Sequence, residues 1–257
     1  MITRLVRGGL AAALAVTTLT VAAAAVATAA PTVVATAVSG PNVTVTQAGN
    51  YPIFPVDNTS FSVTWKSTGT ADVTGVTRLT VDLPPGLTTT GALMYSTPYD
   101  YTFTQTVSPD GRRLEAVFTG TRAPGRSDFM KVQVSSHGTR PSGVITVTAA
   151  NKDDADPSDN VSRYLLGSGL QAPVTPAAPA VTALAPSTGP AAGGTAVTIT
   201  GTGLTNGFAL FGNTPANGSC TDTACVVTAP AGSGTVPVTL VAPGGSAATP
   251  TAFTYTP

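Results

Sequence analysis

Short segments in which apolar and polar residues alternate run along this chain from residue 42 to its end. Side chains of a β-strand point to opposite faces in turn, so a period of two predicts half-buried strands. Val, Thr and Ile dominate these segments, and such branched side chains suit a pleated surface. The alternating or nearly alternating segments are residues 42–46, 61–65, 78–83, 131–134 and 144–148. Further strands are predicted at residues 197–200, 208–211, 225–228, 236–241 and 253–255. No convincing helical period of 3.6 residues follows residue 31, which predicts an all-β fold.

Turn signals separate the segments. Pro-Pro-Gly at 84–86, Ser-Pro-Asp-Gly at 108–111 and Ala-Pro-Gly at 123–125 are turn formers. Short strands with turn signals about every 8–12 residues are typical of antiparallel β-sandwiches. A Pro/Ala-rich stretch at residues 168–178 has the composition of a semi-rigid linker. The sequence therefore predicts two sandwich domains, at residues 32–167 and 179–257.

The first 29 residues have the organisation of a secretory signal peptide. Arg4 and Arg7 precede an uncharged stretch at 8–26, and Ala27-Thr28-Ala29 supplies the small residues that signal peptidase requires. An uncleaved membrane anchor is the alternative, because the apolar run is long enough. We predict cleavage after Ala29 and a secreted, extracellular product that no longer binds the membrane.

Charge limits the classes of partner. Charged residues make up 9% of the chain and the formal net charge is +0, against about 25% charged residues in an average soluble domain. A neutral chain exerts no long-range attraction on nucleic acid or anionic membranes. From residue 181 onward the one charged side chain is that of Asp222.

The second domain resembles the IPT/TIG family of immunoglobulin-like domains over residues 179–257. A glycine-rich turn at Gly193-Gly194-Thr195 precedes a Val-Thr-Ile-Thr-Gly strand, and Phe211-Gly212 follows a later strand. Ala229-Pro230 and the closing Phe253-Thr254-Tyr255 extend the likeness. The resemblance implies an immunoglobulin-like sandwich that acts as a structural or binding module without catalytic residues.

The first domain resembles the bacterial surface repeat called domain of unknown function eleven. The similar segments are Trp65 to Val76, the Leu-Pro-Pro-Gly-Leu element ending at Leu87, and the Asp-Pro-Ser-Asp-Asn turn ending at Asn160. The resemblance extends over about residues 42–165, apart from 91–125. It implies an immunoglobulin-like spacer or adhesive unit of a bacterial surface protein.

The two cysteines, Cys220 and Cys225, are predicted to form a disulfide. Export places them in an oxidising compartment, where paired thiols tend to oxidise. Structural zinc would need two further ligands, and the second domain offers no His and one acid. A redox role lacks the Cys-x-x-Cys spacing, and no cofactor is predicted.

An acidic run near residue 155 has two interpretations. Calcium binds six to eight oxygens, and Asp153, Asp154, Asp156 and Asp159 could supply several of them. The run lacks the bend glycine and the closing Glu of a calcium loop. The alternative is a solvated turn in which Asp side chains accept hydrogen bonds from nearby backbone N–H groups.

Two groups of side chains are candidates for ligand contact. Tyr95, Tyr99 and Tyr101, near Phe103, could stack on sugar rings or anchor a protein partner; the alternative is a strand that packs half into the core. Four arginines could meet an anionic wall polymer, or lie on a mixed, solvated face among acidic residues. They are Arg112, Arg113, Arg122 and Arg126.

Signs of catalysis are few. The single His, His137, lies in a polar segment between two strands, and Glu115 is the one Glu. Neither a serine triad nor a pair of glycosidase carboxylates follows from the spacing. We therefore predict a monomeric, non-enzymatic adhesion or scaffold protein whose partner is a cell-wall or extracellular polymer or a surface protein. An accessory carbohydrate-binding component of a polysaccharide-acting system is the alternative.

Overall fold

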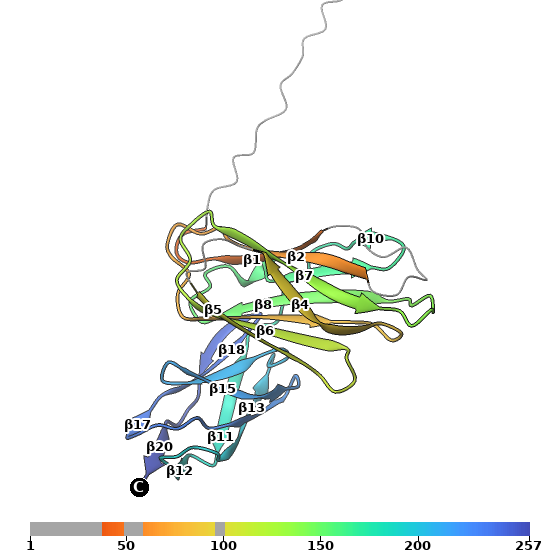
Figure 1. Cartoon of the computed structure of the whole chain (residues 1–257). Helices are drawn as coiled ribbons and strands as arrows, with labels where there is room; N and C mark the ends of the chain where they lie inside the picture. The colour runs from red at the N-terminus through yellow and green to blue at the C-terminus, as the bar shows by residue number, and fades with distance from the viewer. Residues whose placement is uncertain (1–37, 49–58, 96–100) are drawn as a thin grey trace, which may run out of the picture. The chain divides into compact units, whose positions relative to one another are not determined.

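The computed structural model describes residues 38–48, 59–95 and 101–257. The secretory signal predicted for residues 1–29 lies outside these ranges. The described residues form strands β1 to β20 and one short 3-10 helix, η1 (Figure 1). The prediction of two all-β sandwiches of immunoglobulin-like type is confirmed. Within the described ranges, no helix has the length and apolar character needed to cross a membrane.

One sheet of the first sandwich has the strand order β1-β2-β7-β4, with every pair antiparallel. Its strands are β1 (Val43–Ala48), β2 (Thr59–Ser67), β7 (Ser127–Ser135) and β4 (Thr88–Tyr95). Burial alternates along β2 and β7 as the sequence pattern predicts. This sheet therefore has one face in the core and one open face.

The opposing sheet has the order β10-β9-β8-β3-β6-β5. Its strands are β3 (Val76–Asp82), β5 (Tyr101–Val107), β6 (Arg113–Gly120), β8 (Val144–Asn151), β9 (Val161–Leu165) and β10 (Gly169–Leu170). Helix η1 (Pro157–Asp159) connects β8 to β9. Six of the seven residues of the central strand β3 are buried, because its outward side chains meet the second sandwich, as described below.

An aromatic cluster organises the core of the first sandwich. Trp65 lies against Phe118 with ring centroids 4.8 Å apart, and Phe103 lies 5.2 Å from the same phenylalanine. Leu79, Leu87 and other aliphatic side chains fill the space around these rings. Each fully buried side chain of this size contributes about 2 kcal/mol of transfer free energy.

The second sandwich pairs a seven-stranded sheet, β11-β13-β16-β15-β14-β18-β19, with a three-stranded sheet, β12-β20-β17. The strands of the larger sheet are β11 (Ala180–Ala185), β13 (Ala196–Thr202), β14 (Phe208–Phe211), β15 (Thr214–Cys220), β16 (Ala224–Thr228), β18 (Val238–Ala242) and β19 (Gly245–Ala248). The smaller sheet contains β12 (Thr188–Pro190), β17 (Thr235–Val236) and β20 (Phe253–Thr256).

Few bulky side chains fill this second core. Phe253 lies edge-on to both Phe211 and Tyr255, with ring centroids 5.1 Å apart in each pair. The Gly193 turn requires glycine, since its φ is +77° and an added Cβ would lie 2.6 Å from the backbone of Pro230 and Ala231. The turn glycines and the aromatic residues that carried the resemblance thus have structural roles.

Several strands differ from the sequence-based expectation. The segment 236–241 is two strands rather than one, because Pro237 has no N–H to continue the ladder. Strand β10 lies inside the segment 168–178 that was expected to be linker. The unassigned region 91–125 contains β5, β6 and most of β4. Gly91 shifts the register of β4 and so hides its alternation.

The two sandwiches lie within one compact unit, Thr36–Pro257. A small buried cluster joins them: Val76 and Ala150 of the first sandwich pack with Phe208, Leu210 and Val241 of the second. Hydrogen bonds run beside it, from Ser246 Oγ to the Lys152 carbonyl and from Asn160 Nδ2 to the Pro243 carbonyl.

Candidate functional site: an aromatic sheet face

The open face of sheet β1-β2-β7-β4 carries a patch of large apolar side chains. Leu93 and Tyr95 project from β4, and Phe129 projects from the adjacent strand β7; they are 53%, 41% and 38% exposed. They alternate with the inward residues Ala92, Met94, Asp128 and Met130. We call Leu93, Tyr95, Phe129 and Lys131 the aromatic face (Figure 1 shows the four strands).

The two rings of the aromatic face form a parallel stack. Tyr95 and Phe129 are direct cross-strand partners, with ring centroids 5.3 Å apart and ring planes 3° from parallel. Aromatic cross-strand pairs stabilise a sheet by about 0.2–1 kcal/mol. The stack holds both rings in one orientation before any ligand arrives.

A lysine stands over this stack. Lys131 is the next outward residue of β7 after Phe129, and its Nζ lies 5.1 Å from the centroid of the Tyr95 ring. An ammonium over an exposed aromatic ring gains about 0.5–1 kcal/mol from the ring quadrupole. The positive charge is therefore held next to the rings.

Hydroxyl side chains continue the aromatic face across the sheet. The register places Thr46, Thr64, Phe129 and Tyr95 in one cross-strand row. Ser62, Lys131 and Leu93 form the next row. The first row spans about 14 Å, given a strand spacing of about 4.8 Å.

The charged residues at the described outward positions of these four strands are lysines. Lys66 of β2 is exposed, as is Lys131. Within the four strands as the structure describes them, Asp128 is the one acidic residue, and its side chain is buried on the opposite face. A ligand on this face therefore meets lysines, hydroxyls and rings, but no carboxylate from these strands.

The free edge of β4 is occupied by a side chain. Gln105 of β5 accepts a hydrogen bond from the Ala92 N–H at 2.8 Å and donates to the Ala92 carbonyl at 3.1 Å. The Gln105 amide thus makes the two backbone hydrogen bonds that a neighbouring strand would make at Ala92. Gly91 makes room for it, since an added Cβ would lie 3.2 Å from the Gln105 amide.

Of the three tyrosines singled out in the sequence, the structure places Tyr95 in the aromatic face. Tyr101 begins β5, which belongs to the opposing sheet; its side chain and Tyr99 lie outside the described residues. Phe103 is half-buried against Phe118. The tyrosine-rich segment is therefore divided between two sheets.

Phe129 was missed from sequence. The signal was present: Phe129 and Lys131 alternate with the apolar residues Met130 and Val132, so both should point outward. Its partner on β4 depends on a long-range pairing that local periodicity does not give.

The acidic run forms a hydrogen-bonded turn. Asp156 caps η1, accepting from the N–H of Ser158 at 3.1 Å and from its Oγ at 2.6 Å. Asp154 accepts from the Val43 N–H at 3.2 Å and from Asn160 Nδ2 at 2.5 Å. Asp153 pairs with the adjacent Lys152. These bonds correspond to the turn interpretation.

Burial changes the acidity of this turn. Desolvation raises the pKa of Asp159 to about 6, although Asn42 Nδ2 donates to its carboxylate at 3.0 Å. Burial also raises the pKa of Asp154. In the described ranges, no three His, Cys, Asp or Glu side chains are grouped as metal ligands. The calcium interpretation of the four aspartates stays a prediction.

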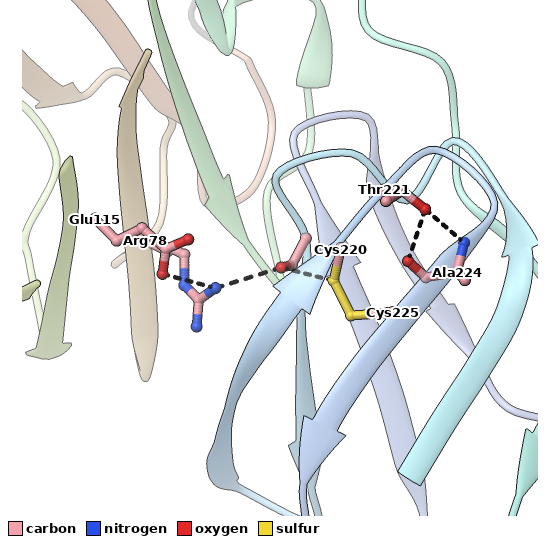
Figure 2. The surroundings of a disulfide bond; sticks show 7 residues. Arg78, Glu115, Cys220, Thr221, Ala224 and Cys225 are labelled. Carbon is pink, nitrogen blue, oxygen red and sulfur yellow. Dashed lines mark hydrogen bonds and ion pairs between the residues drawn. A yellow bond between two sulfur atoms is a disulfide. The ribbon is translucent and has the colours of Figure 1, made fainter. Parts of the chain in front are cut away.

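The disulfide joins direct partners in the β15–β16 hairpin (Figure 2). Cys220 and Cys225 are paired in register and bonded through their sulfurs. The Thr221 Oγ1 closes the turn between them through hydrogen bonds with the Ala224 N–H and carbonyl. The disulfide links the two strands of one short hairpin and therefore has a structural role.

An arginine connects this hairpin region to the first sandwich. Arg78 Nη1 lies 3.4 Å from Glu115 and donates to the Gly207 carbonyl at 3.3 Å (Figure 2). Its guanidinium lies 4.7 Å from the centre of the Phe208 ring. The same Gly207 carbonyl is 3.0 Å from the sulfur of Cys220. Burial lowers the pKa of Arg78, while Glu115 favours its charged form.

Of the four arginines considered as a polymer-binding group, three bond to other parts of the molecule, and one of these, Arg122, is buried. Arg113 pairs with Asp82 at 2.7 Å and donates to Asn206 Oδ1 at 2.8 Å. Arg112 donates to the Leu83 carbonyl. Arg122 is buried in an ion pair with Asp128. Arg122 therefore does not belong to a solvated face, because its bridge to Val73 directs it onto Trp65.

The residues considered for catalysis lie apart. Glu115 of β6 is paired with Arg78 at the junction of the sandwiches. His137 is exposed in the turn after β7, with a φ of +50°, and its Nε2 lies 2.8 Å from Thr88 Oγ1. The structure thus does not bring His137 and Glu115 into one site.

Family comparison identifies the second sandwich. Residues 179–255 match the family model of the IPT/TIG domain. This part of the chain is therefore an IPT/TIG domain, which confirms the family predicted from its glycine-rich turn. IPT/TIG domains are generally non-catalytic. Because the match covers less than half of the chain, it assigns a family to the second sandwich alone.

Comparison with solved structures adds distant similarities. The full extracellular region of plexin A4 is 17% identical with a TM-score of 0.30, covering 83% of this chain and 18% of that one. AvmM, described as catalysing macrocyclization in alchivemycin A biosynthesis, is 13% identical with a TM-score of 0.30. That match covers 52% of this chain and 93% of AvmM. The BSP domain of a biofilm associated protein is 10% identical with a TM-score of 0.27, covering 86% and 53%. Scores this low carry no argument about fold or function. A search of curated proteins found no match.

Proposed function

We propose that this chain is an exported, non-catalytic binding protein that serves as an adhesion or scaffold module outside the cell. In this proposal the first sandwich contacts an extracellular polymer or a surface protein, and the IPT/TIG domain is a structural module. The protein acts as a monomer and needs no cofactor.

The aromatic face carries the proposal. Exposed large apolar side chains that occur singly are ordinary, whereas a group of them marks a site of interaction. Leu93, Tyr95 and Phe129 lie together on two adjacent strands. Tyr is also enriched in the contact residues of binding sites, because it combines a large apolar ring with a polar tip.

The charge distribution supports the same division between the domains. The IPT/TIG domain has Asp222 as its one charged residue and therefore few groups for ion pairing. The first sandwich has one exposed lysine, Lys131, over the aromatic stack and a second, Lys66, farther along the same face. Specific recognition is better served by the first sandwich.

A pull-down with the full exported chain tests this function. The chain is incubated with cell-wall, polysaccharide and surface-protein fractions, and its retention is compared with that of Phe129→Ser. Val226→Ser is the matched control, since Val226 is an exposed apolar residue of β16 in the other domain. We expect retention by at least one fraction, lost with Phe129→Ser and kept with Val226→Ser. No retention, or equal loss in both variants, would refute the proposal.

A further inference from the structure

We propose that the aromatic face binds an acidic polysaccharide, a chain of sugars that carry carboxylates. This inference rests on the proposed binding function and names the class of its partner. Three features of the open face support it: the ring stack, the lysines and the row of hydroxyls.

The ring stack suits a sugar ring. One face of a pyranose presents C–H groups with partial positive charge, and the π-face of an aromatic ring is negative. Tyr95 and Phe129 are already parallel and fixed on adjacent strands. Tyr95 is on the edge strand β4, so a polymer approaching from the edge reaches its ring first.

The lysines select an acidic polymer. Lys131 Nζ is 5.1 Å from the Tyr95 ring centre, so a sugar packed against the rings would place its carboxylate near an ammonium. Lys66 is exposed on β2, farther along the face. The buried position of Asp128 leaves these charges without an acidic neighbour on the described outward positions of the sheet.

The hydroxyl row suits a polymer rich in hydroxyl groups. Thr46 and Thr64 extend the row of Phe129 and Tyr95 across the sheet. Such side chains donate and accept hydrogen bonds, as sugar hydroxyls do. An extended saccharide lying across the strands would meet rings first and hydroxyls next.

Proteins and nucleic acids fit this face less well than an acidic polysaccharide does. A protein strand that adds to the edge of β4 would have to displace the Gln105 amide from Ala92. A stable protein interface buries about 800 Å² per partner around an apolar centre, and this patch has three large apolar side chains. Nucleic acid binding rests on many phosphate contacts, and this face supplies two lysines.

Affinity gel electrophoresis of the full exported chain tests the inference. Polygalacturonate is the acidic probe and dextran the neutral one. We expect polygalacturonate to retard the protein, with binding that weakens as salt is raised. The double variant Tyr95→Ala/Phe129→Ala should bind at least about tenfold more weakly, and Lys66→Gln/Lys131→Gln about three- to tenfold more weakly. Val226→Ala, which changes an exposed residue of the IPT/TIG domain, should bind like the parent.

Folding of each variant is checked by circular dichroism and urea unfolding. Two conservative single variants complete the set. Tyr95→Phe keeps the aromatic ring and Lys131→Arg keeps the positive charge, so each should retain most of the polygalacturonate binding. Equal retardation of the parent and the double ring variant would overturn the inference. So would preference for dextran, or binding to vesicles of phosphatidylcholine with phosphatidylglycerol in place of polygalacturonate.

The outcomes separate this inference from the proposed function. Phe129-dependent retention by a wall or surface-protein fraction, without retardation by polygalacturonate, overturns the acidic polysaccharide and leaves the binding function in place. Failure in both experiments overturns both.

Discussion

Tyr95 and Phe129 lie ring against ring on adjacent strands, although β5 and β6 separate them in the chain. The pairing of β4 with β7 brings them together, and that pairing also defines the edge that Gln105 covers. The surface proposed for binding and the protection of its edge thus depend on the same strand.

The buried ion pair of Arg122 and Asp128 is expected to be essential for the first sandwich. Asp128→Asn would leave the Arg122 guanidinium buried without its countercharge, at a cost of about 3–5 kcal/mol. Urea unfolding followed by fluorescence measures this, and Trp65 reports it directly because Arg122 stacks on its ring. Asp222→Asn, at an exposed position, is the control. Equal stability of the two variants would show that the pair contributes little.

Loss of the Gln105 amide is expected to promote self-association. Gln105→Ala removes the partners of the Ala92 N–H and carbonyl and exposes an edge that another strand can pair with. Light scattering after size-exclusion chromatography should show concentration-dependent oligomers. Thr104→Ala, at an exposed neighbouring position on β5, should leave the protein unchanged. A monomeric Gln105→Ala protein at high concentration would contradict this role.

Stability should fall as the pH rises from about 4 to about 6. The pKa of Asp159 is about 6 in the folded protein and near 3.8 when unfolded, so the folded state binds more protons in this window. The free energy of unfolding therefore decreases as pH increases there. The raised pKa of Asp154 acts in the same direction.

Asp159→Asn isolates this effect. The amide oxygen can still accept from Asn42 but does not titrate, so the variant's unfolding free energy should depend less on pH between 4 and 6 and exceed the parent's at pH 7. Urea unfolding at a series of pH values measures both. If the unfolding free energies of parent and variant depend on pH in the same way, Asp159 is not the cause of the pH dependence.

Removing the disulfide should weaken the IPT/TIG domain moderately. The bond closes a short loop, and the chain-entropy relation gives about 2 kcal/mol for it. Cys220→Ser/Cys225→Ser should lower the unfolding free energy by this amount and retain the fold. The intact mass of the parent protein under non-reducing conditions checks the bond itself; two free thiols would refute it.

Calcium should leave the melting temperature unchanged. Asp154 and Asp156 already accept hydrogen bonds from the backbone and side chains of the turn, so binding an ion would disrupt them. Differential scanning calorimetry with calcium and with a chelator provides the comparison. A clear increase with calcium, lost in Asp154→Asn, would favour the metal interpretation instead.

Local periodicity predicted the strands that have one buried face and one solvent-facing face. The segments at 61–65, 131–134 and 197–200 all lie within observed strands, because each alternates buried and exposed residues. The IPT/TIG domain was also recognisable, since its glycine turn and Phe-Gly pair are local signals.

The aromatic face was only partly predictable. Tyr95 stood out by residue type, but Phe129 did not, because its role depends on which strand pairs with β4. The burial of Arg122 and Arg78 was also hidden. Trp65, on which Arg122 stacks, is distant in sequence, and Phe208 and Gly207, which Arg78 contacts, belong to the other sandwich. Periodicity gives the face on which a residue lies, and pairing determines what it meets there.

The low charge of the IPT/TIG domain has a consequence for its resistance to proteases. Its residues include no Lys or Arg, and the last basic residue of the chain is Arg163, held within strand β9. Proteases that cleave after Lys or Arg therefore have no site between residues 164 and 257. Any tryptic digestion of this protein should leave one fragment that contains the IPT/TIG domain whole.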